Sequence, residues 1–277
     1  MNRAADRPSE RPPAPPLRVA IHGAGGRMGQ SVTRVAVAEG LQVVGAVVSR
    51  GSPLIGRDAG EVAGAGNVGV ALSDDTAAGL LGADVVIDFS RADAVPRLLQ
   101  LAARARVAVV SGTTRLDAHA ERLLDEAAKE IPVLWSPNTS LGVHVLAQLA
   151  AQAARLLGPD FDVEIVEAHH RAKVDAPSGT AVRLVEAVRS ARAGLRDVHG
   201  REGNVGPRPT DEIGVHAVRG GDVIGDHTVH LLGPGERLEL THRATSRELF
   251  ARGAVRAAVA LRGSPPGRYS MADVIGG

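Results

Sequence analysis

The sequence lacks cysteine and has few aromatic residues, and these shortages exclude several kinds of site. Its 277 residues include no Cys, which excludes disulfides, thiolate nucleophiles, Cys-ligated zinc and iron–sulfur clusters. It holds only three Phe, one Tyr and one Trp, too few for the stacking platforms of single-strand nucleic-acid binders. The 32 basic side chains nearly cancel the 31 acidic ones. We therefore expect no nucleic-acid partner.

Long apolar runs are also missing. None approaches the roughly 20 residues that span a bilayer, so we expect no membrane partner. Residues 1–16 carry five of the 16 prolines and no apolar signal core, which predicts a flexible N-terminal extension and not a secretory signal. The lack of cysteine fits a reducing compartment, and we expect the protein to be cytoplasmic. The length allows one large domain or two.

Strands and helices alternate through the first half of the chain. Short apolar runs predict strands, and periodic segments between them predict helices. The strands are expected at 17–21, 41–48, 84–89, 107–110 and 132–135, with a weak one at Val70, and the helices at 27–39, 76–81, 92–105 and 117–129. Residues 51–69 predict an irregular loop. This alternation indicates a Rossmann-like parallel sheet.

The pattern changes in the second half. Residues 141–157 form one long amphipathic helical pattern. Strands are then expected at 161–168, 213–219, 223–232 and 237–244, mostly without helices between them, and a helix at 246–261. We predict an α/β protein with two parts. A dinucleotide-binding domain comprises 17–140 and 245–277, and an α+β substrate-binding and oligomerisation domain with an open mixed sheet comprises 141–244.

A glycine-rich turn joins the first strand to the first helix. It runs Gly23, Ala24, Gly25, Gly26, Arg27 and Met28, followed by Gly29. Glycines let the backbone approach a pyrophosphate, and a helix N-terminus attracts its charge. The spacing departs from G-x-G-x-x-G because Met28 stands at the third glycine. A tight turn without a ligand is the alternative, but four glycines in seven residues favour a cofactor site.

Two further loops follow strand ends at the edge where open α/β sheets bind ligands. They are Ser111-Gly112-Thr113-Thr114 and Ser136-Pro137-Asn138-Thr139. Both offer small hydrogen-bond donors and backbone amides. Helix capping by Ser and Thr would explain each loop alone. Their position beside the glycine turn favours a cofactor-binding role.

The run from Glu167 to Ala181, EAHHRAKVDAPSGTA, passes from a strand end through a cationic loop into a helix. His169, His170 and Lys173 supply proton donors and positive charge, and residues 178–180 place amides at a helix start. An anionic substrate fits there because carboxylates bind helix N-termini, and a histidine can donate a proton to a forming product. A solvated basic loop before a capped helix is the alternative.

A zinc site is not expected. His216, His227, His230 and His242 show no H-x-x-x-H spacing and no nearby carboxylate triad. Strand spacing explains 216, 227 and 230 as surface or interface positions. There is no G-x-S-x-G nucleophile elbow. We predict no metal.

Four runs of the sequence closely resemble the 4-hydroxy-tetrahydrodipicolinate reductase family, historically called dihydrodipicolinate reductase. They are VAIHGAGGRMG, EAHHRAKVDAPSGTA, VRGGDVIGDHTV and GERLELTHRATSR. The resemblance covers nearly the whole chain from residue 17. It implies reduction of a cyclic imine-type dicarboxylate by NADH or NADPH in the diaminopimelate route to lysine. It also implies a homotetramer, with which the polar alternation of 213–244 agrees.

The resemblance also implies roles for individual residues. His169 matches the proton donor, Lys173 a second catalytic residue and His170 a substrate contact, while Gly179 and Thr180 match the amides that grip a substrate carboxylate. Either His169 or Lys173 could deliver the proton. The implied cofactor contacts are Gly23, Ala24, Gly25, Gly26, Arg27, Met28, Arg50, Gly112, Thr113, Thr114, Ser136, Pro137, Asn138 and Thr139.

Two positions depart from the family pattern. Thr139 stands where Phe is usual, and Ser49 stands where many members carry an acidic residue. An acidic side chain there would accept from the ribose of NADH and repel the 2′-phosphate of NADPH. With Arg50 and Arg27 nearby, the sequence favours NADPH over NADH.

Two other functions stay open at this point. The chain could be another two-domain NAD(P)-dependent oxidoreductase acting on an amino-acid-derived imine. It could also be a nucleotide-sensing protein without catalysis, although intact His169 and Lys173 argue against a sensor.

Overall fold

The computed structural model describes residues 15–276, and its first sheet is parallel throughout. Apart from Pro15 and Pro16, the extension predicted at 1–16 lies outside the described residues. The sheet has the order β11-β5-β4-β3-β1-β2. Its strands are β1 (Arg18–His22), β2 (Gln42–Val47), β3 (Val85–Asp88), β4 (Ala108–Ser111), β5 (Pro132–Trp135) and β11 (Gly267–Tyr269). The predicted Rossmann-like sheet is confirmed.

Helices cover both faces of this sheet because successive strand residues point to opposite sides. Ile21 and Ile87 pack in one core with residues of α1 and α8, whereas Ala20 and Val86 pack in another with residues of α4 and α5. The longer helices are α1 (Arg27–Ala38), α4 (Val95–Ala105), α5 (Ala118–Ala128) and α8 (Glu248–Ala260). The short ones are α2 (Ala59–Ala63), α3 (Thr76–Gly79), η1 (Ala92–Ala94) and α9 (Met271–Gly276).

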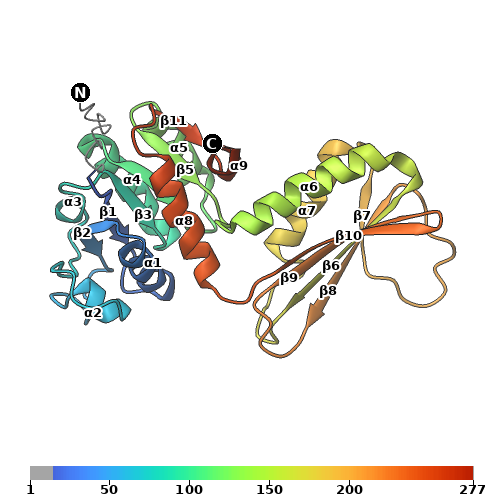
Figure 1. Cartoon of the computed structure of the whole chain (residues 1–277), viewed down its shortest axis with the longest axis horizontal. Coiled ribbons are helices and arrows are strands. Elements are labelled where there is room, and N and C mark those ends of the chain that lie inside the picture. Colours follow the sequence, from blue (N-terminus) through green and yellow to red (C-terminus); the bar gives the residue numbers. More distant parts are fainter. Residues whose placement is uncertain (1–14, 277) are drawn as a thin grey trace, which may run out of the picture.

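The second sheet is open and mixed, as the sequence predicts. Its order is β10-β9-β6-β8-β7, with β6, β7 and β8 parallel and β9 antiparallel to both β6 and β10. The strands are β6 (Asp162–His169), β7 (Arg196–His199), β8 (Glu212–Arg219), β9 (Asp226–Gly233) and β10 (Glu236–Arg243). Helices α6 (Leu141–Leu157) and α7 (Gly179–Ala191) lie side by side along it (Figure 1). The 3₁₀ turn η2 (Gly158–Asp160) leads from α6 to β6.

The chain passes between the two sheets twice, before α6 and again between β10 and α8 (Figure 1). The two passages contact each other. The hydroxyl of Thr139 donates to the carbonyl of Phe250 at 2.7 Å. A Cβ atom on Gly253 would lie 1.7 Å from the carbonyl oxygen of Thr139, so only glycine lets α8 approach this closely.

The loop at 51–69 is organised by one carboxylate. Asp58 caps α2 by accepting from the amides of Gly60 and Glu61, and it also accepts from those of Val68 and Val70. These bonds fold the loop back on itself. The weak strand expected at Val70 does not form, because the backbone there bonds to the Asp58 side chain and Ala71 makes only an isolated bridge.

Three elements were not predicted, namely β7, β11 and α9. All three are short, and β7 is mostly exposed, so none of them carries an apolar period long enough for a prediction. The strand expected at 223–232 begins only at Asp226. Within residues 15–276, the structure contains no helix that combines the length and apolar character needed to cross a membrane.

Candidate active site

The predicted site residues gather at the carboxyl ends of strands in both sheets. The glycine turn follows β1, the two small-residue loops follow β4 and β5, and the histidine pair ends and follows β6. In open α/β sheets this is the edge that binds ligands. The two parts of the site meet directly, because the side-chain amide of Asn138 donates to the hydroxyl of Thr180 at 3.0 Å.

Some backbone amides of the glycine turn donate hydrogen bonds within the protein, and others are free. The amides of Gly23 and Ala24 donate to the carbonyl of Val47 at 2.9 and 2.8 Å, which ties the turn to β2. In the described part of the chain the amides of Gly25, Arg27 and Met28 have no acceptor. They lie at the N-terminus of α1, where an anionic group is favoured. The turn therefore has the chemistry of a pyrophosphate site.

Gly29 has a role that the sequence analysis missed. A Cβ atom there would lie 2.1 Å from the carbonyl oxygen of Gly23 and 2.7 Å from the Cα of Ala24. Gly29 thus allows the close packing of helix on strand that the third glycine of G-x-G-x-x-G provides. This explains how Met28 can stand one position earlier.

A fully buried carboxylate supports the loop after β4. Asp88, 0% exposed, accepts hydrogen bonds from the side chains of His22 at 2.8 Å, Ser111 at 2.6 Å and Thr113 at 2.8 Å, and from the amide of Ser90 at 3.1 Å. Burial by itself raises the pKa of Asp88, but the hydrogen bonds led by His22 outweigh it and lower the pKa. Asp88 is therefore ionised, and His22 donates through Nδ1.

The loop after β4 is closely packed. A Cβ atom on Gly112 would lie 2.2 Å from the ring of Phe89, and the indole of Trp135 donates to the carbonyl of Thr113 at 2.8 Å. The hydroxyl of Thr113 is already bonded to Asp88, whereas Thr114 is exposed. Of the predicted contacts in this loop, Thr114 has the most accessible side chain.

The loop after β5 is held from both sides. The carbonyl of Asn138 accepts from Ser136 Oγ at 2.6 Å and from His144 Nε2 at 2.7 Å, and Arg183 of α7 donates to His144 Nδ1 at 2.8 Å. These bonds require a neutral His144, and burial lowers its pKa accordingly. Pro137 is exposed. Thr139 is buried and bonded to Phe250, so its side chain is not available to a ligand.

A second fully buried carboxylate holds the predicted proton donor. Glu167, 0% exposed, accepts from His169 Nδ1 at 2.5 Å, from the amide of Ser178 at 3.0 Å and from both terminal nitrogens of Arg219 at 2.7 Å. Neither Glu167 nor Arg219 was predicted to have a role. The E-x-H spacing was the available signal for Glu167, because residues i and i+2 of a strand share a face.

The cationic loop and the start of α7 lie next to His169. His170 is half-buried, and Lys173 bonds to both carboxylate oxygens of Asp175 at 2.9 and 2.8 Å. Ser178 caps α7 by accepting from the amide of Ala181 at 3.2 Å. In the described chain the amides of Gly179 and Thr180 have no acceptor and remain free for an anion.

The prediction that His227 lies at a surface or interface position is wrong. This side chain is 3% exposed, its Nε2 lies 3.1 Å from Ser178 Oγ, and its ring meets that of His169 edge-on at 5.1 Å between centroids. Burial lowers the pKa of His227 to about 4, so the ring is neutral near pH 7. Val229 and Leu231 share its face of β9, and this alternation was the missed signal.

Comparison with known proteins identifies the family. The profile described as "Dihydrodipicolinate reductase, N-terminus" matches residues 17–139, and "Dihydrodipicolinate reductase, C-terminus" matches 142–275. The chain is similar to the 4-hydroxy-tetrahydrodipicolinate reductase of Anaeromyxobacter dehalogenans, with 54% identity over 94% of this chain and 97% of the relative. It belongs to the dihydrodipicolinate reductase family. The relative from Acinetobacter baumannii is 48% identical over 94% of this chain and 96% of its own.

Solved structures agree on the fold. A dipicolinate-bound dihydrodipicolinate reductase from Paenisporosarcina is similar with a TM-score of 0.75 at 22% identity, over 94% of this chain and 99% of that one. A probable dehydrogenase from Thermotoga maritima has a TM-score of 0.61 at 12% identity, over 93% and 92% of the two chains. The chain is therefore an NAD(P)H-dependent oxidoreductase of the reductase family.

The loop after β2 in this reductase lies beside the glycine turn. A Cβ atom on Gly25 would lie 3.0 Å from side-chain atoms of Val48 and of Leu54, so residues 48–54 border the turn. Ser49 and Arg50 are both exposed there. In the described residues the Arg50 side chain has no hydrogen-bond or ion-pair partner. It is therefore available to a ligand.

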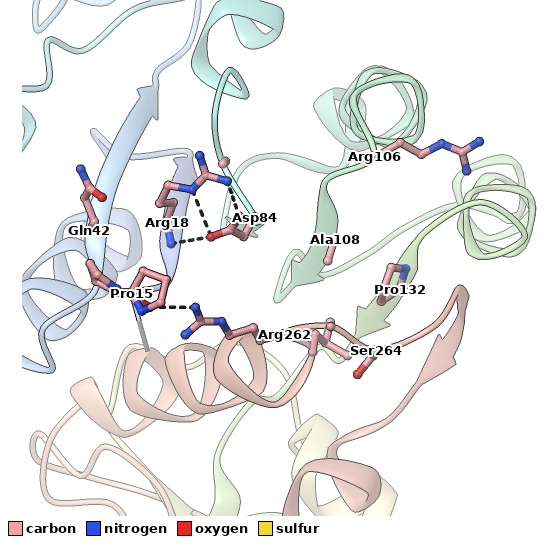
Figure 2. Close-up of a pocket in the computed structure, with 13 residues that line it drawn as sticks. Pro15, Arg18, Gln42, Asp84, Arg106, Ala108, Pro132, Arg262 and Ser264 are labelled. Atoms are coloured by element: carbon pink, nitrogen blue, oxygen red, sulfur yellow. Dashed lines mark hydrogen bonds and ion pairs between the residues drawn. The ribbon is translucent and has the colours of Figure 1, made fainter. Parts of the chain in front are cut away.

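A large cavity of the reductase lies at the wrong edge for this chemistry. It has a volume of about 730 Å³ and is lined by residues at the amino ends of strands, among them Arg18, Gln42, Ala108 and Pro132 (Figure 2). Arg18 is paired with Asp84 in its lining. Parallel sheets bind substrates at their carboxyl ends, so we assign no catalytic role to this cavity. Among residues 15–276 no group of three or more His, Asp or Glu side chains is arranged to hold a metal ion.

Replacing Asp88 by Ala is expected to destabilise the reductase by about 3–5 kcal/mol, because the polar side chains of His22, Ser111 and Thr113 would be left buried without their acceptor. Asp93→Ala is the control: its Arg91 pair is exposed and contributes about 0–1 kcal/mol. Urea unfolding at pH 7 measures both. An equal effect of the two changes would contradict the role given to Asp88.

The contribution of Asp88 to the free energy of unfolding depends on pH, and the pKa shift of Asp88 gives the sign. Because the folded-state pKa of Asp88 lies below its ordinary value of 3.8, its contribution is present above that value and is lost as the pH falls through the folded-state pKa. The free energy of unfolding of the wild type should therefore fall more steeply on acidification below pH 3.8 than that of Asp88→Ala.

Proposed function

We propose that this reductase converts 4-hydroxy-tetrahydrodipicolinate to tetrahydrodipicolinate, with NADPH as the preferred reductant, where the loops of the two sheets meet. The step belongs to diaminopimelate and lysine biosynthesis, which also supports a cytoplasmic location. The observation that carries the proposal is the joining of His169 and the free N-terminus of α7 through Glu167, next to the cofactor-side loops. This arrangement combines a proton donor with a carboxylate site.

The residues at the carboxyl edge of the first sheet fit a dinucleotide. The free amides of Gly25, Arg27 and Met28 suit a pyrophosphate, while Gly23, Ala24 and Gly26 shape the turn. The loops at 112–114 and 136–139 border the nicotinamide half. When bound, the cofactor supplies the hydride that reduces the substrate.

The substrate is a dicarboxylate, and the start of α7 fits one of its carboxylates. The amides of Gly179 and Thr180 point out of the helix N-terminus, and the Thr180 hydroxyl lies between them and Asn138. Lys173 adds positive charge for the second carboxylate, and His170 can donate a hydrogen bond to it. Lys173 would exchange its bond to Asp175 for one to the substrate.

We assign proton delivery to His169. Loss of the 4-hydroxyl as water forms the conjugated imine. Hydride then adds to one end of that conjugated system, which places electron density on the carbon farther along it, and a proton must be added there. His169 has its Nδ1 bonded to Glu167, which leaves Nε2 to face the substrate. Lys173 then stabilises the developing negative charge.

Domain roles follow from this placement. Residues 17–140 with 245–277 would bind the dinucleotide, and residues 141–244 would bind substrate and form the oligomer. A homotetramer is supported by the second sheet, whose face away from α6 and α7 carries Glu164, His216, Thr228 and Val218. Sedimentation equilibrium at micromolar concentration should give four times the mass of the 28.6 kDa chain. A monomer under those conditions would contradict the proposal.

Preference for NADPH rests on Ser49 and Arg50. The small hydroxyl of Ser49 and the free guanidinium of Arg50 border the turn. An acidic side chain at position 49 would repel the 2′-phosphate of NADPH, and the guanidinium attracts it. Arginine binds phosphate through paired donors and a permanent charge.

His169→Gln is expected to lower kcat by about 10²–10⁴-fold, because it removes the general acid. Lys173→Ala should also lower kcat strongly. Cofactor affinity should change little in either variant, since neither residue lies in the dinucleotide loops. The assay follows NADPH oxidation with the product of dihydrodipicolinate synthase. A near-normal kcat would refute the role of the residue concerned, and tight NADPH binding by the wild type without any turnover would favour a sensor.

The double variant Ser49→Glu, Arg50→Ala should reverse the cofactor preference. The glutamate would accept from the NADH ribose and repel the 2′-phosphate, and the arginine that attracts that phosphate would be gone. The ratio of kcat/KM for NADPH and NADH measures the change, with Arg57→Ala as a control on the same loop. A wild-type preference for NADH, or an unchanged ratio in the double variant, would refute the assignment.

A further inference from the structure

Glu167 connects three parts of the proposed substrate site. Its two carboxylate oxygens accept from the His169 ring, from the amide of Ser178 at the cap of α7, and from the Arg219 guanidinium on the neighbouring strand β8. One carboxylate therefore sets the positions of the proton donor and of the helix that would bind the substrate carboxylate.

Burying the Glu167 carboxylate costs folding free energy, so stability alone does not explain its presence. An ionised carboxylate with 0% exposure is tolerated only when it is paired and fully hydrogen-bonded, and an apolar group of the same shape often serves stability as well. Burial raises the pKa of Glu167, but the hydrogen bonds of Arg219 and His169 outweigh it and lower the pKa. The side chain is therefore a charged acceptor at neutral pH.

The ionised state of Glu167 determines which ring nitrogen of His169 carries a hydrogen. A carboxylate only accepts, so Nδ1 of His169 carries a hydrogen and Nε2 is the atom that gains or loses the catalytic proton. A Cβ atom at position 225 would lie 3.0 Å from Nε2. Gly225 thus leaves space beside the reactive nitrogen that a larger residue would fill.

Charges of both signs face the His169 ring. Burial lowers the pKa of His169, Glu167 opposes this by raising it, and Lys173 and Arg219 lower it further. The neutral ring of His227 packs on it from β9, and Asp175 is already paired with Lys173. His242 of β10 faces His227, and burial lowers its pKa as well. Glu167 is thus the negative charge in direct contact with the imidazole, and Arg219 is the positive charge that offsets it.

We propose that Glu167 and Arg219 are positioning residues for His169: Glu167 orients the ring and stabilises its protonated form, and Arg219 moderates that effect by sharing the same carboxylate. The inference rests on the proposed function for its catalytic consequence, but the ring contact exists independently of the reaction. Removing Glu167 should move the titration of the His169 ring in one direction, and removing Arg219 should move it in the other. A purely structural role would not produce opposite shifts.

The test compares Glu167→Gln and Arg219→Met with a matched control, Glu164→Gln. Glu164 lies on the same strand and is paired with Arg201, Arg208 and His216, which lower its pKa to about 2, but its bonds do not include His169. The pH dependence of kcat is measured with the product of dihydrodipicolinate synthase. The titration of the His169 ring is followed by NMR in each protein, and thermal unfolding reports stability.

Loss of the Glu167 charge should move the alkaline limb of kcat, and the His169 titration, to lower pH. It should also lower kcat by about 10- to 100-fold, less than removal of the acid itself. Arg219→Met should move both to higher pH, and Glu164→Gln should move neither. Shifts in the same direction in both variants, or no shift in either, would overturn the proposal.

The experiment distinguishes a failure of the proposed function from a failure of the positioning roles of Glu167 and Arg219. If the wild type does not reduce that substrate, the proposed function fails, while the NMR titrations still decide whether Glu167 and Arg219 set the protonation of His169. If Glu167→Gln does not fold, Glu167→Asp takes its place. A shorter carboxylate keeps the charge, so restored folding with a titration near that of the wild type supports the proposal, and a titration lowered as if the charge were absent overturns it.

Discussion

The functional edge of this reductase depends on two buried carboxylates, each satisfied by four hydrogen bonds. Asp88 ends β3 in the first sheet and gathers His22, Ser111, Thr113 and the amide of Ser90. Glu167, near the end of β6 in the second sheet, gathers side chains and an amide of the substrate loop in the same way. Charge-assisted hydrogen bonds of this kind are stronger and more directional than neutral ones. Each therefore holds its loop in one arrangement, as a preorganised ligand site requires.

The two sites are linked by few but specific contacts. Asn138 of the loop after β5 donates to Thr180 at the start of α7, and Arg183 of α7 supports His144, which in turn holds the Asn138 carbonyl. Both passages between the sheets lie close by, joined through Thr139 and Phe250. Movement of one sheet relative to the other would therefore act on the loop that we propose borders the nicotinamide.

Much of the fold could be predicted because it rests on local patterns. The alternation of strands and helices predicted the parallel sheet, which is confirmed. The dinucleotide site predicted at the glycine turn stays a prediction. The supporting network could not be predicted in the same way, since its partners are distant in the chain: His22 and Asp88 are 66 residues apart, and Glu167 and Arg219 are 52. His227 was misplaced because its polar side chain suggested a surface position, although it alternates with the apolar residues of β9. The loop at 51–69 depended on Asp58, whose bonds reach 12 residues ahead.

The central claim is that the start of α7 binds a substrate carboxylate while Glu167 presents His169 to the reacting carbon. The most direct measurement is a crystal structure of the reductase with NADPH and dipicolinate, an aromatic dicarboxylate with the carbon frame of the substrate. The account predicts one dipicolinate carboxylate on the amides of Gly179 and Thr180, His169 Nε2 facing the ring, and Nδ1 still bonded to Glu167. Dipicolinate bound at another place, or His169 turned away from Glu167 in the complex, would contradict it.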